Sequence, residues 1–261
     1  MLKNIIFNAL KSGYFKTMLL KVVKRFEKNT SMEARRWALK NSKQTISDFC
    51  CSLDKDLWDE SQRVCESLSR EAAQILSKIP FNLGGGGAHP LLYFLVRRLK
   101  PKVIIETGVA AGWSSAAILS AIEKNSFGKL YSSDFPYFRL DEPEKYIGVL
   151  VKDSLKVNWQ VDVRGDAVAV PYFQELIGAD KIDFIHYDSD KSYSGREFVL
   201  DRLILQVSDT AKLLVDDIQD NFQFRDFVEK KNLDYDVFEF EGKFIGLVSD
   251  IGLKLKRTTI E

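Results

Sequence analysis

Short apolar runs and helix-length amphipathic segments alternate along the chain after residue 102. The runs are rich in β-branched and aromatic residues and are the expected strands: 103–106, 130–133, 159–163, 182–187, 212–215, 235–240 and 244–248. Helical patterns between most of the first five indicate an open parallel sheet with helices on both faces. Only Glu241-Gly242-Lys243 separates the last two strands, which predicts a hairpin. We therefore expect an α/β fold whose seven-stranded, mostly parallel sheet ends in an antiparallel strand.

The N-terminal part has a different pattern. Residues 1–80 contain helical segments with polar breaks at 29–31 and 52–54, so we expect an N-terminal helical extension over 1–80 and one domain over 81–261. The segment FNLGGGGAH, residues 81–89, contains four consecutive glycines. It is either a flexible linker or a lid on the substrate side of a site.

Charge is distributed unevenly. Residues 1–43 hold eleven Lys and Arg but only two acidic residues, although the whole chain has a net charge of +1. Apolar residues recur there at helical spacing, at Ile6, Leu10, Phe15, Leu19, Val22 and Phe26. Such a basic amphipathic helix either contacts an anionic membrane surface or docks on the body of the protein or on a second subunit, which would make a homo-oligomer. The rest of the chain is acidic, which argues against a nucleic-acid partner.

Composition and the spacing of the cysteines bear on where in the cell the protein is expected. Hydrophobic residues make up 45% and charged residues 29% of the 261 positions, as in ordinary globular proteins. The sequence has no apolar run of about 18 residues and no signal-peptide cleavage pattern at its start. Cys50, Cys51 and Cys65 lack disulfide or zinc spacing, which favours a reducing environment. We expect a cytoplasmic protein, with peripheral membrane attachment left open.

The segment VIIETGVAAGWSSAAILSAI, residues 103–122, carries the first chemical signal. It predicts a buried strand, a turn with Gly108 and Gly112 four residues apart, and a helix that begins near Ser114. Glycines allow the backbone to approach a ligand, and the free N–H groups of a helix N-terminus favour an anionic group. Glu106 would repel a phosphate but attract an ammonium group. A carboxylate next to an ammonium group describes the methionine end of S-adenosylmethionine.

Acidic residues follow the next two expected strands. Asp134 can accept hydrogen bonds from both hydroxyls of a ribose, and Asp166 can accept one from an adenine amino group. The backbone N–H of Ala167 can then serve a ring nitrogen. An acid after a strand is also a common helix cap, so each signal is weak alone. Their order along the chain predicts a single cofactor site at the carboxyl ends of the strands.

A second acidic group follows the fourth and fifth strands. Asp188, Asp190 and Lys191 end one, and Asp216 and Asp217 end the other. Gathered carboxylates repel one another unless a cation lies between them, and oxygen ligands suit Mg²⁺. Such an ion would lower the pKa of a substrate hydroxyl. A partly desolvated Lys191 beside it would have a lowered pKa and could accept the proton. The alternative is that these acids cap helices or pair with arginines.

Together these motifs resemble class I S-adenosylmethionine-dependent methyltransferases, in particular the metal-dependent O-methyltransferases that act on catechol, caffeoyl-CoA or bacterial sugars. The resemblance covers about residues 88–250 and implies a Rossmann-like fold. ETGVAAGWS resembles the family motif E-x-G-x-x-x-G-[YW]-S, and Asp188-Ser189-Asp190-Lys191 resembles D-A-D-K.

The resemblance also implies residue roles. Gly108 and Gly112 would cradle the cofactor, Ser114 would hold its carboxylate, and Asp134 would bind the ribose. Asp188, Asp216 and Asp217 would be the metal ligands, and Lys191 the base. In the sugar-methylating relatives Asp190 has that last role, and Asp217, where the small-phenol enzymes usually have Asn, favours the sugar type.

The expected function is therefore methyl transfer from S-adenosylmethionine to a hydroxyl group of a small molecule or sugar. Aromatic residues of the loop 135–148 are candidates for the acceptor pocket. The alternatives are a non-catalytic S-adenosylmethionine-binding protein and a methyltransferase that acts without metal. A nicotinamide-dependent dehydrogenase is disfavoured because the turn lacks G-x-G-x-x-G.

Overall fold

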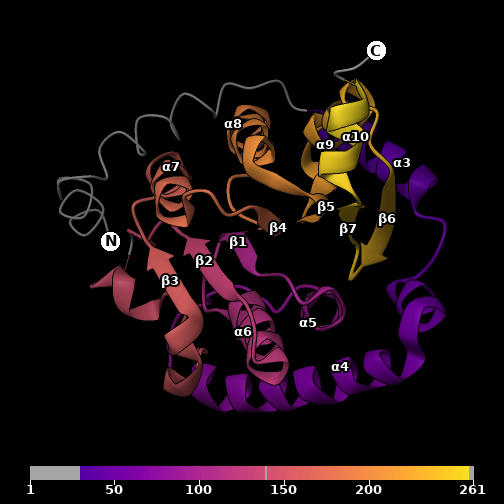
Figure 1. Cartoon of the computed structure of the whole chain (residues 1–261). Coiled ribbons are helices and arrows are strands. Elements are labelled where there is room, and N and C mark those ends of the chain that lie inside the picture. The colour runs from indigo at the N-terminus through magenta and orange to yellow at the C-terminus, as the bar shows by residue number, and fades with distance from the viewer. Residues whose placement is uncertain (1–29, 139, 259–261) are drawn as a thin grey trace.

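Seven strands form one sheet at the centre of the chain (Figure 1). The computed structural model describes residues 30–138 and 140–258. The strands are β1 (Val103–Thr107), β2 (Lys129–Ser133), β3 (Trp159–Asp162), β4 (Ile182–Tyr187), β5 (Val207–Val215), β6 (Tyr235–Phe240) and β7 (Lys243–Val248). Their order is β3-β2-β1-β4-β5-β7-β6, in which β7 is antiparallel to both of its neighbours and the first five strands are parallel. The predicted fold class is confirmed.

Helices cover both faces of the sheet (Figure 1). They are α3 (Ser31–Asn41), α4 (Ile46–Leu76), α5 (His89–Leu99), α6 (Trp113–Asn125), α7 (Asp166–Ile177), α8 (Tyr193–Leu203), α9 (Gln223–Lys230) and α10 (Ile251–Thr258). Short 3₁₀ helices connect other elements: η2 (Pro143–Tyr146), η3 (Asp153–Asn158), η4 (Ile204–Gln206) and η5 (Ile218–Asp220). One apolar core lies under α7, α8, α9 and α10, and another lies under α4, α5 and α6.

Strand residues alternate between these two cores because successive side chains point to opposite faces. On β1, Val103 and Ile105 join the first core, whereas Ile104 joins the second. All five residues of β1 are buried, as expected for a central parallel strand covered on both sides. The polar residues at the ends of these strands are therefore held by a rigid frame.

The helices of the predicted N-terminal extension divide between the two faces. Helix α3 contributes Ala38 to the first core, and α4 contributes Cys50, Trp58 and Cys65 to the second. The polar break expected at 52–54 is present, since Asp54 has non-helical backbone angles inside α4. The division into residues 1–80 and 81–261 stays a prediction.

The basic amphipathic segment lies mostly outside the described residues, so its attachment to a membrane, to the body of the protein or to a second subunit stays a prediction. Within residues 30–138 and 140–258, none of the helices combines the length and the apolar character needed to cross a membrane.

Candidate active site

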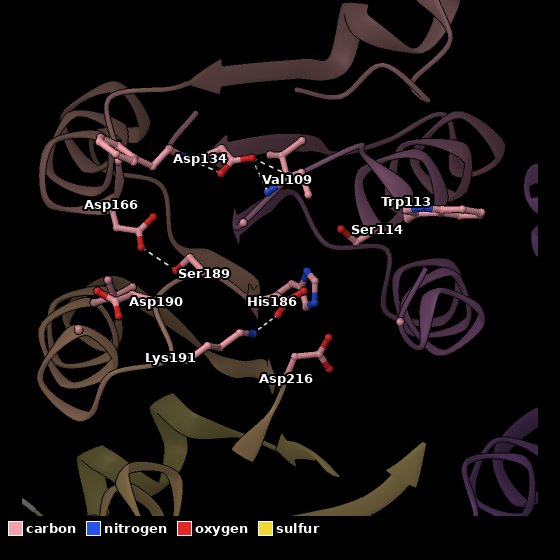
Figure 2. Close-up of a pocket in the computed structure, with 18 of the residues that line it drawn as sticks. Val109, Trp113, Ser114, Asp134, Asp166, His186, Ser189, Asp190, Lys191 and Asp216 are labelled. Carbon is pink, nitrogen blue, oxygen red and sulfur yellow. Dashed lines mark hydrogen bonds and ion pairs between the residues drawn. The ribbon is translucent and has the colours of Figure 1, made fainter. Parts of the chain in front are cut away.

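A cavity of about 780 Å³ opens at the carboxyl ends of the parallel strands. Its wall includes the turn after β1, the ends of β2, β4 and β5, the start of α7, and part of α8. Figure 2 shows Asp134 and Asp166 on one side of it, with His186, Lys191 and Asp216 gathered on another. Ligands bind at this edge in open α/β sheets, so the strands deliver the predicted side chains to the expected place.

The glycine turn packs tightly against its surroundings. Gly108 has φ +86°, and a Cβ there would lie 2.3 Å from the backbone carbonyl oxygen of Asp188. Gly112 has φ +97°, and its Cβ would lie 2.8 Å from Cα of Gly148. Gly108 and Ser114 line the cavity, whereas Gly112 is not among the lining residues. Both glycines thus permit close packing of the protein chain, and Gly108 also faces the cavity.

Glu106 lies behind the turn and is fully buried. Its Oε2 accepts hydrogen bonds from the hydroxyls of Ser115, at 2.6 Å, and Ser132, at 2.7 Å. Its Oε1 lies 3.5 Å from Nδ1 of His186. Glu106 is not among the residues that line the cavity. Its contact with an ammonium group stays a prediction.

Asp134 ties the end of β2 to the glycine turn. Its Oδ2 accepts from the backbone N–H groups of Val109, at 3.2 Å, and Ala110, at 2.6 Å, while Oδ1 accepts from Phe135. Burial raises the pKa of Asp134 to about 6, although these three N–H donors act in the opposite direction. The carboxyl group lines the cavity and keeps lone pairs for a ligand.

Asp166 begins α7 and connects two strand ends. Its Oδ1 accepts from Ser133 of β2, and its Oδ2 accepts from Ser189 after β4, both at 2.6 Å. The Ser189 hydroxyl also lies 3.0 Å from the hydroxyl of Thr107, whose proton it can accept. Asp166 and Ala167 both line the cavity beside Asp134. The two serines fix the carboxylate in one orientation.

A possible cation-binding group lies at the ends of β4 and β5. Among the described residues, His186, Asp188 and Asp216 each offer a ligand atom, and these atoms all lie within 4.8 Å of one another. All three residues line the cavity. Burial raises the pKa of Asp216 to about 6, and the neighbouring Asp188 raises it further. One imidazole and two carboxylates are a donor set that fits a divalent ion.

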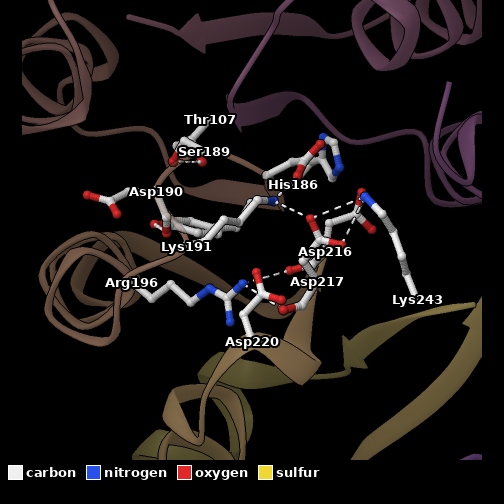
Figure 3. A network of polar contacts seen from close by, with 12 residues as sticks. Thr107, His186, Ser189, Asp190, Lys191, Arg196, Asp216, Asp217, Asp220 and Lys243 are labelled. Carbon is white, nitrogen blue, oxygen red and sulfur yellow. Dashed lines mark hydrogen bonds and ion pairs between the residues drawn. The ribbon is translucent and has the colours of Figure 1, made fainter. Parts of the chain in front are cut away.

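Asp217 occupies a different environment from Asp216. Its φ of +54° turns the chain, and its carboxylate lies 2.9 Å from Nζ of Lys191 and 3.1 Å from Nζ of Lys243 (Figure 3). Burial opposes ionisation, but the two lysines lower the pKa of Asp217 to about 2. Asp217 belongs neither to the His186 group nor to the cavity lining.

Lys191 lines the cavity and pairs with both Asp188 and Asp217. Burial alone would lower its pKa, but the two carboxylates outweigh burial and raise it. This raised pKa belongs to Lys191 in its two ion pairs, and the lowered pKa expected beside a bound cation stays a prediction. Asp190 points in another direction (Figure 3), and its Oδ1 accepts from the N–H and the hydroxyl of Ser192 at the start of α8.

Arg196 of α8 supports the end of β5 from below (Figure 3). It is completely buried, and its Nη2 donates to the backbone carbonyl oxygens of Asp216, at 3.2 Å, and Asp217, at 2.8 Å. The sequence left open that the acids pair with arginines. Arg196 does bind Asp216 and Asp217, but through their backbone carbonyl oxygens. The guanidinium group fixes the direction in which the two carboxylates leave the strand.

The glycine-rich segment forms one wall of the cavity, through residues 85–88. Nδ1 of His89 lies 3.1 Å from the carbonyl oxygen of Gly86, and the His89 ring packs against Trp113 with a centroid distance of 5.6 Å. A Cβ on Gly87 would lie 3.4 Å from Oδ2 of Asp216. The predicted alternative of a substrate-side loop thus agrees with its position.

His186 and Ser189 were not among the site residues predicted from the sequence. His186 precedes Asp188 by two residues, and strand residues two apart point to the same face. That alternation, together with the presence of only two histidines in the chain, was a usable signal. Ser189 had no such signal, because its hydrogen bond to Asp166 depends on how β4 and α7 meet.

Comparison with known proteins agrees with this geometry. Residues 105–218 match the family model described as a methyltransferase domain. The match and the fold together indicate a methyltransferase domain over this segment. No curated protein sequence gives a significant match to the chain.

Several solved structures share the fold. Cofactor-bound Rv0187 from MTB superposes with a TM-score of 0.54 at 14% identity, covering 80% of this chain and 99% of that one. The O-methyltransferase TomG from Streptomyces achromogenes, in complex with SAM, has a TM-score of 0.51 at 18% identity, covering 71% and 89%. An O-methyltransferase from Bacillus cereus, in complex with SAH, has a TM-score of 0.50 at 14% identity, covering 81% and 99%.

Proposed function

We propose that the chain transfers the methyl group of S-adenosylmethionine to a hydroxyl oxygen of a small molecule or sugar, assisted by a divalent cation. One observation carries this proposal. The same cavity holds a nucleoside-type wall, made by Asp134 and Asp166, and a cation-type wall, made by His186, Asp188 and Asp216. A methyl donor and an activated acceptor have to meet in one enclosed space, and this cavity provides both walls.

The first wall suits the methyl donor. Ser114 lies in the first turn of α6, where unpaired N–H groups favour the donor's carboxylate. Asp134 faces the cavity with a carboxyl group that can accept from ribose hydroxyls. Asp166 and Ala167 line the same cavity and would serve an adenine edge, since each carboxylate oxygen can accept a second hydrogen bond. When bound, S-adenosylmethionine supplies the methyl group on a sulfonium that is already a good leaving group.

The second wall suits a cation and the acceptor. His186, Asp188 and Asp216 would hold the ion, and a cation bound there would lower the pKa of an acceptor hydroxyl. Lys191 keeps its ammonium group beside Asp188, next to the place where such a hydroxyl would lie. Asp190 lines the same cavity from the α8 side. Asp190 can thus accept the proton that the hydroxyl loses, whereas Lys191 can do so only after it has given up its own proton, which a cation bound beside it would favour.

Aromatic side chains complete the acceptor side. Trp113, Phe135, Tyr137 and Phe198 line the cavity, and Phe198 is 43% exposed at its edge. Flat apolar faces beside a cation site suit a phenol or one face of a sugar ring. The protein's contribution to the rate is then mainly alignment, which can lower a barrier by about 7–11 kcal/mol.

The test has two stages. Calorimetry with S-adenosylmethionine measures binding, and release of S-adenosylhomocysteine measures turnover with a panel of phenols and sugars, with and without EDTA. We expect binding that depends on Asp134 and turnover that EDTA abolishes and added cation restores. Binding without turnover on any acceptor would indicate a non-catalytic binding protein. Full turnover in EDTA would contradict the role of the cation.

The position of Lys191 also allows a test of the base. We expect Lys191→Met to lower kcat by about 100-fold, the usual contribution of general acid–base catalysis. Asp190→Asn is the matched comparison from the neighbouring residue. If Asp190→Asn removes turnover and Lys191→Met does not, Asp190 holds the proton, as in the sugar-type enzymes that the sequence resembles.

A further inference from the structure

His186 is a buried imidazole with the carboxylates of Glu106, Asp188 and Asp216 close to it. It lies on β4, directly opposite Glu106 of β1 in the strand register, and is only 2% exposed. Its Nδ1 atom is buried and has no hydrogen-bond partner among the described residues, and the same holds for Oε1 of Glu106, 3.5 Å away. A proton on Nδ1 would let the neutral imidazole donate to Oε1 of Glu106, and Nε2 would then be the nitrogen without a proton. Nε2 is the ring nitrogen that is left to act as a ligand.

His186 also contributes to the cavity wall and to the group of possible cation ligands. His186 is one of the lining residues, and a ring nitrogen of His186 lies with the carboxylates of Asp188 and Asp216 within 4.8 Å. Two ligands that are each about 2.0–2.2 Å from one ion lie at most about 4.4 Å apart, so small side-chain movements would bring all three into contact with it. Figure 2 shows His186 and Asp216 next to each other at this wall.

Asp217 is engaged elsewhere, although the sequence predicted it as a ligand. It is the residue after Asp216, and its left-handed backbone turns its carboxylate toward Lys191 and Lys243 (Figure 3). Two ammonium groups within 3.1 Å already neutralise it. A ligand role for Asp217 would require both of these pairs to break, whereas His186 needs no such change.

We propose that His186, and not Asp217, is the third protein ligand of the cation, through Nε2. Glu106 then accepts a hydrogen bond from Nδ1–H and fixes the tautomer that presents Nε2, as carboxylates behind metal-binding histidines commonly do. Ser115 and Ser132 hold Glu106 in turn. Imidazole favours transition-metal ions over Mg²⁺, which prefers oxygen ligands. The ion is thus expected to be a transition metal, and this inference rests on the proposed cation-assisted function.

Pulsed electron paramagnetic resonance of the full chain with Mn²⁺ tests the ligand directly, without any turnover. We expect a ¹⁴N coupling of the strength that a directly bound imidazole gives. The coupling should disappear in His186→Gln, and the Kd for Mn²⁺ should rise by about 10–100-fold. Asp217→Asn is the matched control and should keep both the coupling and a Kd within about threefold of the parent chain, since its partners are lysines.

Glu106→Gln provides a second variant that keeps His186 in place. We expect it to retain the ¹⁴N coupling but to bind Mn²⁺ about 10–100-fold more weakly, because the imidazole loses its orienting carboxylate. Bound Mn²⁺ without ¹⁴N coupling in the parent chain, or loss of Mn²⁺ in Asp217→Asn, would overturn the proposal. Failure of the parent chain to bind Mn²⁺ would overturn it too, whereas the proposed methyl-donor site is judged separately by calorimetry with S-adenosylmethionine.

Discussion

Gly108 lies directly against the backbone carbonyl of Asp188, so that a Cβ at Gly108 would come within 2.3 Å of that oxygen. The contact joins the turn after β1 to the end of β4. Thr107 reinforces it, because its carbonyl accepts from the N–H of Asp188 at 2.8 Å. The proposed methyl-donor wall and the proposed cation wall therefore share one piece of backbone, and a change at Gly108 should affect both.

We expect Gly108→Ala to weaken binding of both S-adenosylmethionine and Mn²⁺ by about tenfold or more, which corresponds to about 1.4 kcal/mol for each ligand. The left-handed backbone and the close carbonyl together should lower the free energy of unfolding by about 1–3 kcal/mol. Calorimetry and urea unfolding measure these effects. Gly242→Ala is the matched control, since Gly242 also has a positive φ but no atom of the described residues lies within 4 Å of its added Cβ. Equal losses of binding in both variants would exclude the contact as the cause.

Binding of S-adenosylmethionine should weaken as the pH falls. Burial raises the pKa of Asp134 to about 6, so the carboxylate that accepts the ribose hydroxyls becomes protonated below that value. The Kd should be constant at pH 7–8 and then rise by up to about tenfold for each pH unit below 6. Calorimetry at pH 5, 6, 7 and 8 measures the profile.

Asp134→Asn is the control for this pH dependence. It should bind about tenfold or more weakly at pH 7.5, because a hydrogen bond to a charged group contributes about 1.5–3 kcal/mol. Its Kd should vary less with pH than that of the parent chain, while any titration of the ligand itself is common to both proteins. Identical profiles in the two proteins would show that Asp134 is not the titrating group.

Burial of Asp134 also makes the free energy of unfolding depend on pH. A carboxyl group with a raised pKa holds its proton in the folded state at a pH where the unfolded chain has lost it. The contribution of Asp134 to stability is therefore present below pH 3.8 and falls as the pH rises toward about 6. Urea unfolding of Asp134→Asn should show a smaller decline over that window. An unchanged slope would contradict the raised pKa.

Arg196→Lys should disturb the cation wall although it keeps the charge. The guanidinium group holds the carbonyl oxygens of both Asp216 and Asp217, and a lysine cannot reproduce its planar fork. We expect the Kd for Mn²⁺ to rise about tenfold and stability to fall by about 1.5–3 kcal/mol. Arg202→Lys is the control on the same helix, because Arg202 contacts Gln174 at an exposed position. A normal Mn²⁺ Kd in a folded Arg196→Lys protein would show that the carbonyls hold their place without it.

Tyr93→Phe tests how firmly the N-terminal helices belong to the folded unit. The Tyr93 hydroxyl on α5 donates to Glu60 of α4 at 2.8 Å, and Arg97 donates to the same oxygen at 3.0 Å. Loss of the hydroxyl should lower the free energy of unfolding by about 1–2 kcal/mol without changing binding of S-adenosylmethionine. Tyr235→Phe should cost less than about 0.5 kcal/mol, since its hydroxyl contacts Asn41 only at 3.5 Å. If Tyr93→Phe leaves global stability unchanged, α4 unfolds separately from the sheet.

Most of the sheet could be predicted because each central strand is a short, nearly uninterrupted apolar run. β5 is the exception, since it begins at Val207 and not at Lys212. Its first residues, including Ser208 and Asp209, are only partly buried and polar, so hydropathy does not reveal them. The hairpin was readable from Gly242, whose φ of +76° follows Glu241 at +50° in the turn.

The site was predictable to the level of the strand end but not to the direction of each side chain. Asp216 and Asp217 are consecutive, so their side chains leave the backbone in different directions and only Asp216 faces the cavity. Which one does so depends on the left-handed turn at Asp217 and on Arg196, neither of which leaves a local sequence signal. Glu106 was placed correctly at the end of β1, but its fully buried position follows from its contacts with other strands.

The division of the N-terminal helices between the two faces has a consequence for the sheet itself. Because α3 packs on one face and α4 on the other, the residues between them, 42–45, have to pass around the β6 edge (Figure 1). There Gln44 donates to Asp236 of β6 at 3.2 Å. An outer strand offers unpaired backbone groups that can recruit a strand from another molecule. The connection covers part of the β6 edge with polar groups. The backbone of β6 is therefore less accessible to a strand of a second molecule.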